Sequence, residues 1–222
     1  MGLIKLIKHN NIPRVLLRYI MMNFLDLSSI KNIILTVKEM NVLDNYSKIF
    51  LENATKGFYW NCVCGRLEVA KWLYSFGGVD IHADDEYAFR WSCQEGHLDV
   101  AQWVYSLGGV DIHAVNEYAF KVSCQNGHLD VAQWLYLIGN VNIHVGDEYA
   151  FRYSCERGHL DVAQWLYSLG NINIHVNNEY AFNYSLERGH AHVARWLYSI
   201  GAKFIKEKNY KINGDMLEKL FA

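Results

Sequence analysis

Proline is nearly absent from this 222-residue chain: Pro13 is the only one, so long proline-rich linkers are excluded. An excess of basic charge is also absent, because 21 Lys and Arg residues stand against 23 Asp and Glu residues. Such a balance gives the chain no overall electrostatic attraction to nucleic acid or to an anionic membrane. We therefore expect neither to be a partner.

Long apolar runs are missing as well. No stretch approaches the roughly 20 apolar residues that a membrane-spanning helix needs. The apolar segment at 16–25 is interrupted by Arg18 and Asn23 and lacks a small-residue cleavage site, which predicts no secretion signal. Leu6 stands where a myristoylation signal needs Ser or Thr. We therefore expect an intracellular, cytoplasmic protein whose five cysteines remain thiols.

What the chain does contain is a repeat of 31 residues. Tryptophans, glycines and the tetrapeptide Glu-Tyr-Ala-Phe all recur at this interval. The tryptophans are Trp72, Trp103, Trp134, Trp165 and Trp196, the glycines are Gly65, Gly96, Gly127, Gly158 and Gly189, and the tetrapeptides begin at Glu86, Glu117, Glu148 and Glu179. Agreement in so many columns predicts a stack of similar structural units.

Each unit is predicted to be a pair of helices. In the unit at 86–116, glycines divide the sequence into two helical segments and a loop. The column of Asp85 contains only Asp and Asn, which predicts the N-cap of the first helix. Glu86 would then lie at the positive end of the helix dipole and four residues before Arg90, a favourable helical pair. Gly96 suits the left-handed turn that ends a helix.

Helical spacing also predicts which side chains are buried. The second segment has an apolar face that consists of Val100, Ala101, Val104 and Leu107. The first segment has a face that consists of Ala88, Phe89, Ser92 and Cys93. Trp103 and Tyr105 point sideways in nearly opposite directions, so we predict that these two columns contact the neighbouring repeats. A two-helix unit this small is stable only when it is stacked.

The repeat resembles the ankyrin repeat. Residues 96–101, Gly-His-Leu-Asp-Val-Ala, are similar to the block that opens the second ankyrin helix, and residues 77–82, Gly-Gly-Val-Asp-Ile-His, are similar to the ankyrin loop. The resemblance covers residues 55 to about 205. It is nearest to the shortened, aromatic-rich ankyrin repeats of giant DNA viruses. It implies an all-α, ankyrin-type helical repeat solenoid that binds a protein, in the host cytoplasm if the chain is viral.

Two departures from the ankyrin pattern modify this expectation. Residues 87–90, Tyr-Ala-Phe-Arg, replace the Thr-Pro-Leu-His motif, and the unit is shorter than the usual length of about 33 residues. The loss falls in the loop between repeats. We therefore expect blunted inter-repeat loops in place of projecting β-hairpins.

The stack is predicted to end in caps. Residues 1–54 are out of register with the repeat, and we interpret them as a helical N-terminal cap or a separate small module. Residues 210–222 are predicted to form a capping helix, and residues 203–222 to dock on the last repeat without binding the partner. Between the caps lie five repeats, at 55–85, 86–116, 117–147, 148–178 and 179–209.

Histidine and cysteine columns favour packing over chemistry. The histidine columns are His97, His128, His159 and His190, and His82, His113, His144 and His175. Stacked helices lie about 8–10 Å apart, so equivalent residues cannot share a zinc ion. The column of Cys62, Cys93, Cys124 and Cys155 ends in Leu186, which indicates buried thiols. Catalytic and phosphate-binding motifs are lacking, so we expect no enzymatic activity, no cofactor and no metal.

Candidate partner-binding residues occupy the variable columns of this otherwise constant repeat. They fall on the outward side or end of the first helix, where ankyrin proteins carry a concave groove. The columns are Trp91, Val122, Tyr153 and Tyr184; Gln94, Gln125, Glu156 and Glu187; and Glu95, Asn126, Arg157 and Arg188. Aromatic and arginine residues are common interface anchors. The aromatic column is also compatible with lateral stacking between first helices.

The function predicted from these features is that of a non-catalytic scaffold. We expect a monomer that holds a partner protein on the concave face of repeats 2 to 5. The alternative is a structural element that assembles with copies of itself, which the aromatic content and the near-identity of the repeats favour.

Overall fold

The computed structural model describes residues 55–75 and 77–204. It divides into two units, Met1–Ile81 and His82–Ala222, which we describe separately. In the first unit, residues 55–63 are helical and are followed by α5 (Leu67–Tyr74). The predicted caps at 1–54 and 210–222 lie outside the described residues, as does nearly all of the segment predicted to dock on the last repeat.

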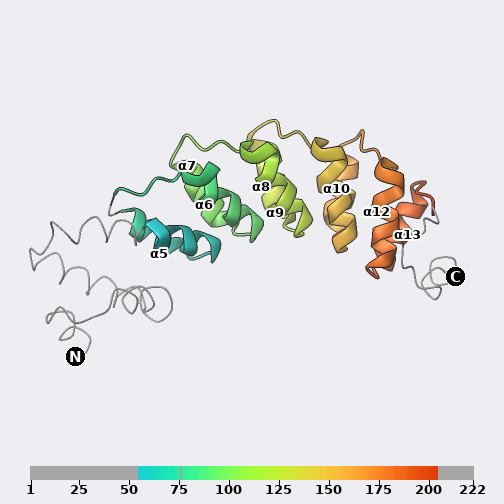
Figure 1. The fold of residues 1–222 in the computed structure, drawn as a ribbon, viewed down its shortest axis with the longest axis horizontal. Helices are drawn as coiled ribbons and strands as arrows, with labels where there is room; N and C mark the ends of the chain where they lie inside the picture. The colour runs from blue at the N-terminus through green and yellow to red at the C-terminus, as the bar shows by residue number, and fades with distance from the viewer. Residues whose placement is uncertain (1–54, 76, 205–222) are drawn as a thin grey trace, which may run out of the picture. The chain divides into compact units, whose positions relative to one another are not determined.

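The second unit is a row of helix pairs (Figure 1). The first helices of successive repeats are α6 (Ala83–Gln94), α8 (Ala114–Gln125), α10 (Val145–Arg157) and α12 (Val176–Glu187). The second helices are α7 (Leu98–Ser106), α9 (Leu129–Ile138), α11 (Leu160–Ser168) and α13 (Ala191–Ser199). Each first helix packs on the second helix of its own repeat, and successive first helices pack on one another. This arrangement confirms the predicted all-α repeat solenoid.

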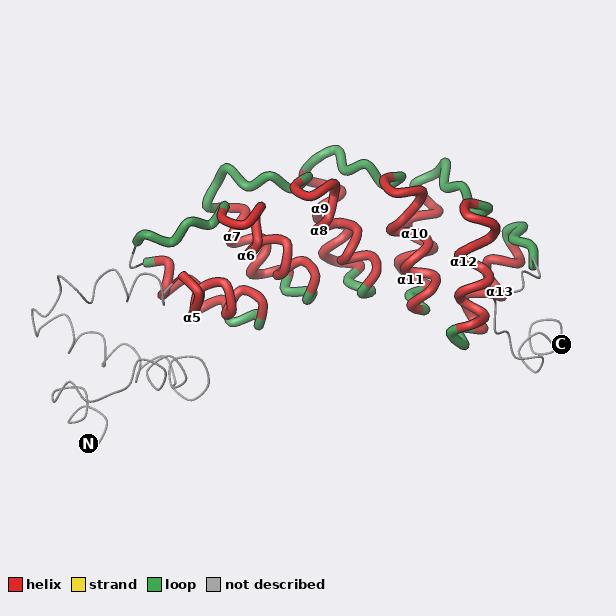
Figure 2. Tube along the Cα trace, in the orientation of Figure 1, coloured by secondary structure: helices red, strands yellow, loops and turns green. Residues whose placement is uncertain are grey.

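Turns and loops separate to opposite ends of the helices (Figure 2). The short turns within repeats lie at one end, and the longer loops between repeats lie at the other. In the described part of the chain these loops contain no strand, as the prediction of blunted loops requires. Gly96 has the predicted left-handed conformation, with φ of 76°. A Cβ atom there would lie 2.4 Å from Nδ1 of His128, so glycine also leaves room for the histidine of the next repeat.

One phenylalanine per repeat forms the centre of the core. Phe89 is fully buried, and so are its equivalents Phe120, Phe151 and Phe182. The residues predicted to face inward on the second helix, Val100, Ala101 and Val104, are fully buried as well, whereas Leu107 is half-buried. Burying one such side chain stabilises the fold by about 1.5–3 kcal/mol.

The tryptophans lie between repeats, which confirms their predicted role. The ring of Trp134 meets the ring of Tyr105 edge-on at 5.7 Å and lies 6.1 Å from the ring of Phe89, both in the preceding repeat. The edge-on pair recurs as Tyr136–Trp165 and Tyr167–Trp196. Each second helix therefore extends its tryptophan toward one neighbour and its tyrosine toward the other.

The start of each first helix differs from the prediction. Asp84, Asp85 and Glu86 form a left-handed turn, with φ values of 53°, 54° and 64°, and the same turn recurs in the next three repeats. The right-handed part of α6 begins only after this turn, and Asp85 lies inside the turn, so the predicted capping role of Asp85 is wrong. Asp and Asn occupy this column because their short polar side chains tolerate the left-handed conformation.

Arginine stabilises this turn through the backbone. Nη2 of Arg90 donates a hydrogen bond to the carbonyl of Asp84 at 2.9 Å, and its Nε donates to the carbonyl of Asp85. Arg152 makes the equivalent two bonds, to the carbonyls of Asp147 and Gly146. The predicted ion pair between Glu86 and Arg90 is therefore wrong. The arginine satisfies carbonyl groups that the left-handed turn removes from helical bonding.

The turn also carries one unfavourable residue, Val115. Its φ is 54°, and its column otherwise contains Asp84, Gly146 and Asn177, which tolerate that value. A left-handed non-glycine residue costs roughly 1–2 kcal/mol, and a β-branched one is a clear outlier. Val115 is 48% exposed, so little packing would be lost with its side chain.

Val115→Gly is therefore expected to raise the free energy of unfolding by about 1 kcal/mol. Chemical denaturation followed by circular dichroism measures this change. The converse variant, Gly146→Val, should lower the midpoint by a similar amount. A lower midpoint for Val115→Gly would contradict the left-handed turn.

Candidate partner-binding site

Hydrogen bonds from tyrosine hydroxyl groups join the first helices of neighbouring repeats. The hydroxyl of Tyr118 donates to Oε1 of Gln94 in the preceding repeat at 2.8 Å. Tyr149 donates to Gln125 at 2.7 Å, and Tyr180 donates to Glu156 at 2.6 Å. Three of the four residues in the second candidate column thus bind the neighbouring repeat.

The aromatic candidate column stacks on these tyrosines. Tyr153 lies 4.2 Å from Tyr149 one turn earlier and 5.7 Å from Tyr180 in the next repeat, measured between ring centroids. Tyr184 lies 4.1 Å from Tyr180, and Trp91 contacts its own repeat's tyrosine at 5.5 Å. The Tyr153–Tyr180 contact is the predicted lateral stacking between first helices, whereas the other three contacts pair rings within one helix.

Two candidate residues are too buried to form much of a surface. Val122 and Glu156 are each 7% exposed. Glu156 accepts hydrogen bonds from Tyr180 and from Nη2 of Arg188, the latter at 3.0 Å. Burial raises the pKa of Tyr180, and its hydrogen bond to the Glu156 carboxylate raises it further. The tyrosine therefore stays protonated and remains a donor to this carboxylate.

The third candidate column lies at the short turns and is the most accessible. Glu95 and Arg157 are exposed, and the Arg188 side chain is 60% exposed. Asn126 is half-buried, because its Nδ2 donates to the backbone carbonyl of Gln94 at 2.9 Å. Side chains from four successive repeats therefore form one row along the turns. Glu187, from the second column, is half-buried at the end of that row.

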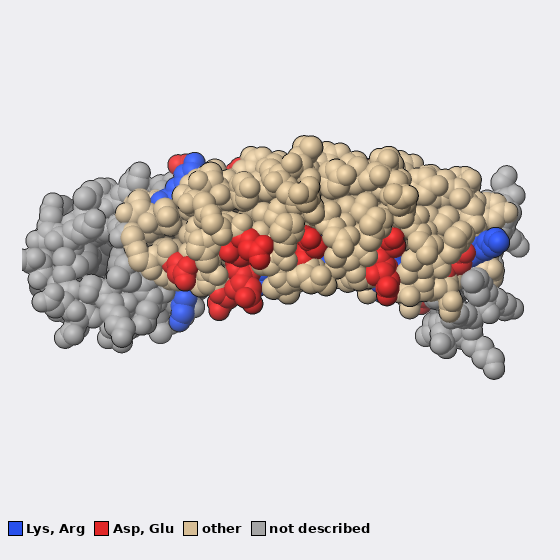
Figure 3. Space-filling view, turned by 90° about the horizontal axis from the view of Figure 1, so that it is seen from above, with Lys and Arg blue, Asp and Glu red and all other residues tan. Residues whose placement is uncertain are grey.

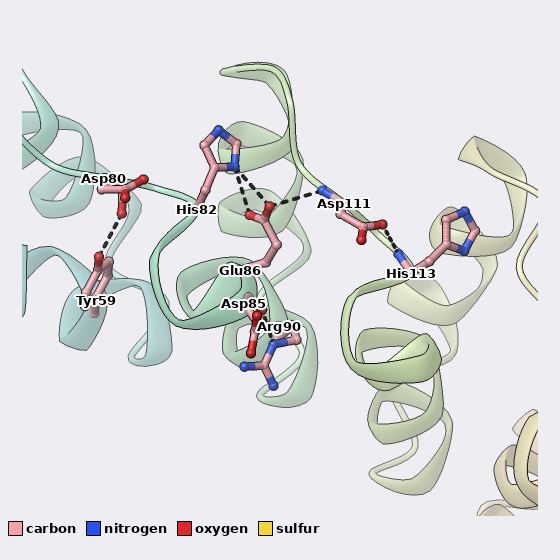
Figure 4. Close-up of polar contacts among 8 residues, drawn as sticks. All are labelled: Tyr59, Asp80, His82, Asp85, Glu86, Arg90, Asp111 and His113. Atoms are coloured by element: carbon pink, nitrogen blue, oxygen red, sulfur yellow. Dashed lines mark hydrogen bonds and ion pairs between the residues drawn. The ribbon is translucent and has the colours of Figure 1, made fainter.

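At the opposite end of the helices, a polar ladder that the sequence did not reveal joins the loops (Figure 4). Nδ1 of His82 lies 3.0 Å from Oε1 of the buried Glu86, and the same oxygen accepts the backbone N–H of Asp111 at 3.2 Å. The Asp111 carboxylate accepts the N–H of His113, whose ring bonds Glu117. The pattern repeats at His144 and His175, each four residues before a glutamate. The four-residue spacing between each histidine and its glutamate was the feature of the sequence that could have revealed this ladder.

Among the described residues, the loop side carries little basic charge (Figure 3). Acidic side chains form separate groups along one edge of this side, and most of the remaining surface is uncharged. The turn row, which includes both arginine and glutamate, therefore has a different charge pattern from the loop side.

Metal binding and membrane insertion have no support in the described part of the chain. Across 55–75 and 77–204, no group of three or more His, Cys, Asp or Glu side chains is placed to hold a metal ion. Nor is any helix within these ranges long and apolar enough to cross a membrane. The histidines after the turn glycines pack as rings on the preceding repeat, as His128 does on Gly96.

The cysteine column is buried, as predicted. Cys62, Cys93, Cys124 and Cys155 have no exposed surface. Burial raises the pKa of Cys62 to about 12 and raises the pKa values of Cys93, Cys124 and Cys155 as well. These thiols therefore stay protonated near neutral pH and are poor nucleophiles.

Comparison with known families gives one match. Residues 120–208 match the family model described as ankyrin repeats in three copies, so this part of the chain consists of ankyrin repeats. The observed helix pairs continue the same 31-residue pattern on the N-terminal side of the match. No curated protein matches the chain. Ankyrin repeats are generally protein–protein interaction modules and typically act as non-catalytic binding scaffolds.

Proposed function

We propose that this chain is a non-catalytic scaffold that binds a partner protein along the turn row and the adjoining first helices of repeats 2 to 5. The observation that supports this function is the pattern of variation. Core positions such as Phe89 and Trp134 are the same in every regular repeat, whereas the accessible column at the turns reads Glu95, Asn126, Arg157 and Arg188. Packing explains why the core residues are the same in each repeat. It does not explain why the residues at the turns differ.

We infer a contact set that is smaller than the twelve predicted residues. Val122 and Glu156 act within the stack, and the tyrosines of the aromatic column present only part of their rings. The exposed charges Glu95, Arg157 and Arg188 are the strongest remaining candidates for direct contact. The stacked tyrosines would form a rigid aromatic surface beside these charged residues.

Affinity capture with a matched pair of variants tests this proposal. The triple variant Glu95→Ser, Arg157→Ser, Arg188→Ser is expected to reduce recovery of the proteins retained by the wild-type chain at least tenfold, because these residues contact the partner. The control replaces exposed second-helix residues, Gln102→Ala and Gln164→Ala, and should retain the same proteins. Equal recovery by the triple variant and the wild type would contradict the proposed surface.

Self-association is the second candidate function, and one observation favours it. Leu137 is 81% exposed on α9, where the other repeats have serine, and Tyr136 beside it is 37% exposed. Exposed apolar groups of this kind occur in contact surfaces. Sedimentation of the purified chain over a range of concentrations separates the two candidates, since a monomer at all concentrations excludes self-assembly.

A further inference from the structure

The formal charge at two positions beside the short turns changes steadily along the repeats. Two positions in each repeat produce this change, the residue before the turn glycine and the residue three after it. They are Glu95 and Asp99, Asn126 and Asp130, Arg157 and Asp161, and Arg188 and His192. With histidine neutral, each pair carries a formal charge of −2, −1, 0 and +1 in turn. A neighbouring column changes in the opposite sense, from Gln94 and Gln125 to Glu156 and Glu187. Glu156 is buried, however, and already accepts hydrogen bonds from Tyr180 and Arg188.

The positive end of the row is a connected cluster, the basic turn patch, which consists of Arg157, Arg188, His190 and His192. Nε2 of His192 lies 3.1 Å from the carbonyl of Gly158, so it donates across to the turn of the preceding repeat. The rings of His190 and His192 lie 6.2 Å apart. Arg157 directly precedes Gly158, so these contacts bring the turns of repeats 4 and 5 together.

The arginines of this patch keep most of their hydrogen-bonding capacity. Arg188 uses Nη2 on Glu156, yet 60% of its side chain is exposed, and Arg157 is exposed as well. A guanidinium group has five N–H donors in a planar fork that matches a carboxylate. Burial lowers the pKa of His190, and His192 and Arg188 lower it further, which indicates that these groups lie within electrostatic range of one another.

We propose that the basic turn patch binds an acidic peptide segment of the partner protein, with carboxylates on Arg157 and Arg188. This inference rests on the proposed scaffold function and specifies the chemistry of its partner. Arginine–carboxylate pairs can form two parallel hydrogen bonds, which add geometric specificity to charge attraction. The negative end of the row, at Glu95 and Asp99, repels the same acidic segment. The gradient therefore determines which repeats the segment occupies.

A peptide fits this patch better than a nucleic acid strand. A phosphate backbone carries a charge at every nucleotide and needs a continuous basic track. Here the carboxylates of Asp161 and Glu187 lie beside the arginines in sequence, and the whole chain has a formal net charge of −2. Carboxylates spaced along a peptide can pair with two separate guanidinium groups and avoid those acidic neighbours.

Fluorescence anisotropy with the full chain and a labelled ten-residue glutamate peptide tests this inference. At low ionic strength the wild-type chain is expected to bind, and Arg157→Glu, Arg188→Glu should weaken binding at least tenfold. The conservative variant Arg157→Lys, Arg188→Lys should fall between them, because lysine keeps the charge but loses the fork. The control Arg66→Glu, Lys71→Glu changes the net charge equally and should bind like the wild type.

Three outcomes would overturn the proposal. They are absence of peptide binding by the wild-type chain, an equal loss in the Arg66 and Lys71 control, and tighter binding of a thymidine oligonucleotide of the same length. The capture experiment keeps the two proposals distinguishable. The wild-type chain could fail to bind the glutamate peptide and still capture proteins that the Glu95, Arg157 and Arg188 triple variant loses. In that case the acidic nature of the partner is wrong, and the scaffold function stands.

Discussion

Trp134→Ala should lower the free energy of unfolding by about 3 kcal/mol, the lower end of the range for replacing a large core side chain with alanine. The lower end applies because Trp134 is half-buried. Its ring nevertheless contacts Phe89 and Tyr105 of the preceding repeat, and alanine would remove both contacts. The loss is therefore expected to weaken the interface between repeats 2 and 3. Equilibrium denaturation followed by circular dichroism measures it.

A matched control lies on the same helix. Leu137→Ser introduces the residue that the other repeats have at this position, and the side chain it removes is 81% exposed. Exposed substitutions of this kind usually change stability by no more than about 0.5 kcal/mol. If Trp134→Ala changed the midpoint as little as Leu137→Ser, the tryptophan would not hold the repeats together.

Packing between repeats could be predicted from the sequence because it follows from helix geometry. In a helix, 100° per residue places Trp103 and Tyr105 on nearly opposite sides, and a repeat has neighbours only on those two sides. Identical columns then predict identical contacts at every interface. The observed Tyr105–Trp134 pair and its two equivalents follow directly.

The left-handed turn could not be predicted, because its residue types are favoured in two different structures. Asp and Asn are favoured at helix N-caps, and they are also among the few residues that tolerate positive φ. The column of Asp85 fits both descriptions. In the left-handed turn the Glu86 side chain meets His82 and Asp111 in the loop that leads to repeat 3, whereas a regular helix would have placed it near Arg90.

The candidate site was located by its variability, and its internal bonding was beyond sequence analysis. Variable columns identified the first helices and the turns. Hydrogen bonds such as Tyr118–Gln94 join residues 24 positions apart on different helices, so their partners depend on how the repeats stack. The sequence shows the charge gradient, but only the structure shows that His192 contacts Gly158 and so brings the basic turns of two repeats together.

Glu117→Ala is expected to lower the free energy of unfolding by about 2 kcal/mol, because it leaves two donors without their acceptor. Glu117 is 7% exposed. Its Oε1 lies 2.9 Å from Nδ1 of His113 and accepts the backbone N–H of Asn142, in the loop that leads to repeat 4, at 3.2 Å. His113 can turn to solvent, since its side chain is 47% exposed, whereas the N–H of Asn142, in the loop that leads to repeat 4, loses its bond to this carboxylate.

Glu117→Gln removes the charge of this side chain and keeps its shape, so it separates their contributions to stability. The amide oxygen can still accept from His113 and Asn142, but hydrogen bonds to a neutral group are weaker than those to a charged one. The other carboxylate oxygen, Oε2, is buried without a hydrogen bond among the described residues, so the amide nitrogen would enter a site that offers it no acceptor. We therefore expect a loss of about 1 kcal/mol for glutamine, smaller than the loss for alanine. Chemical denaturation of both variants measures this order, and a glutamine variant less stable than the alanine variant would show that the buried amide, not the lost bond to Asn142, dominates.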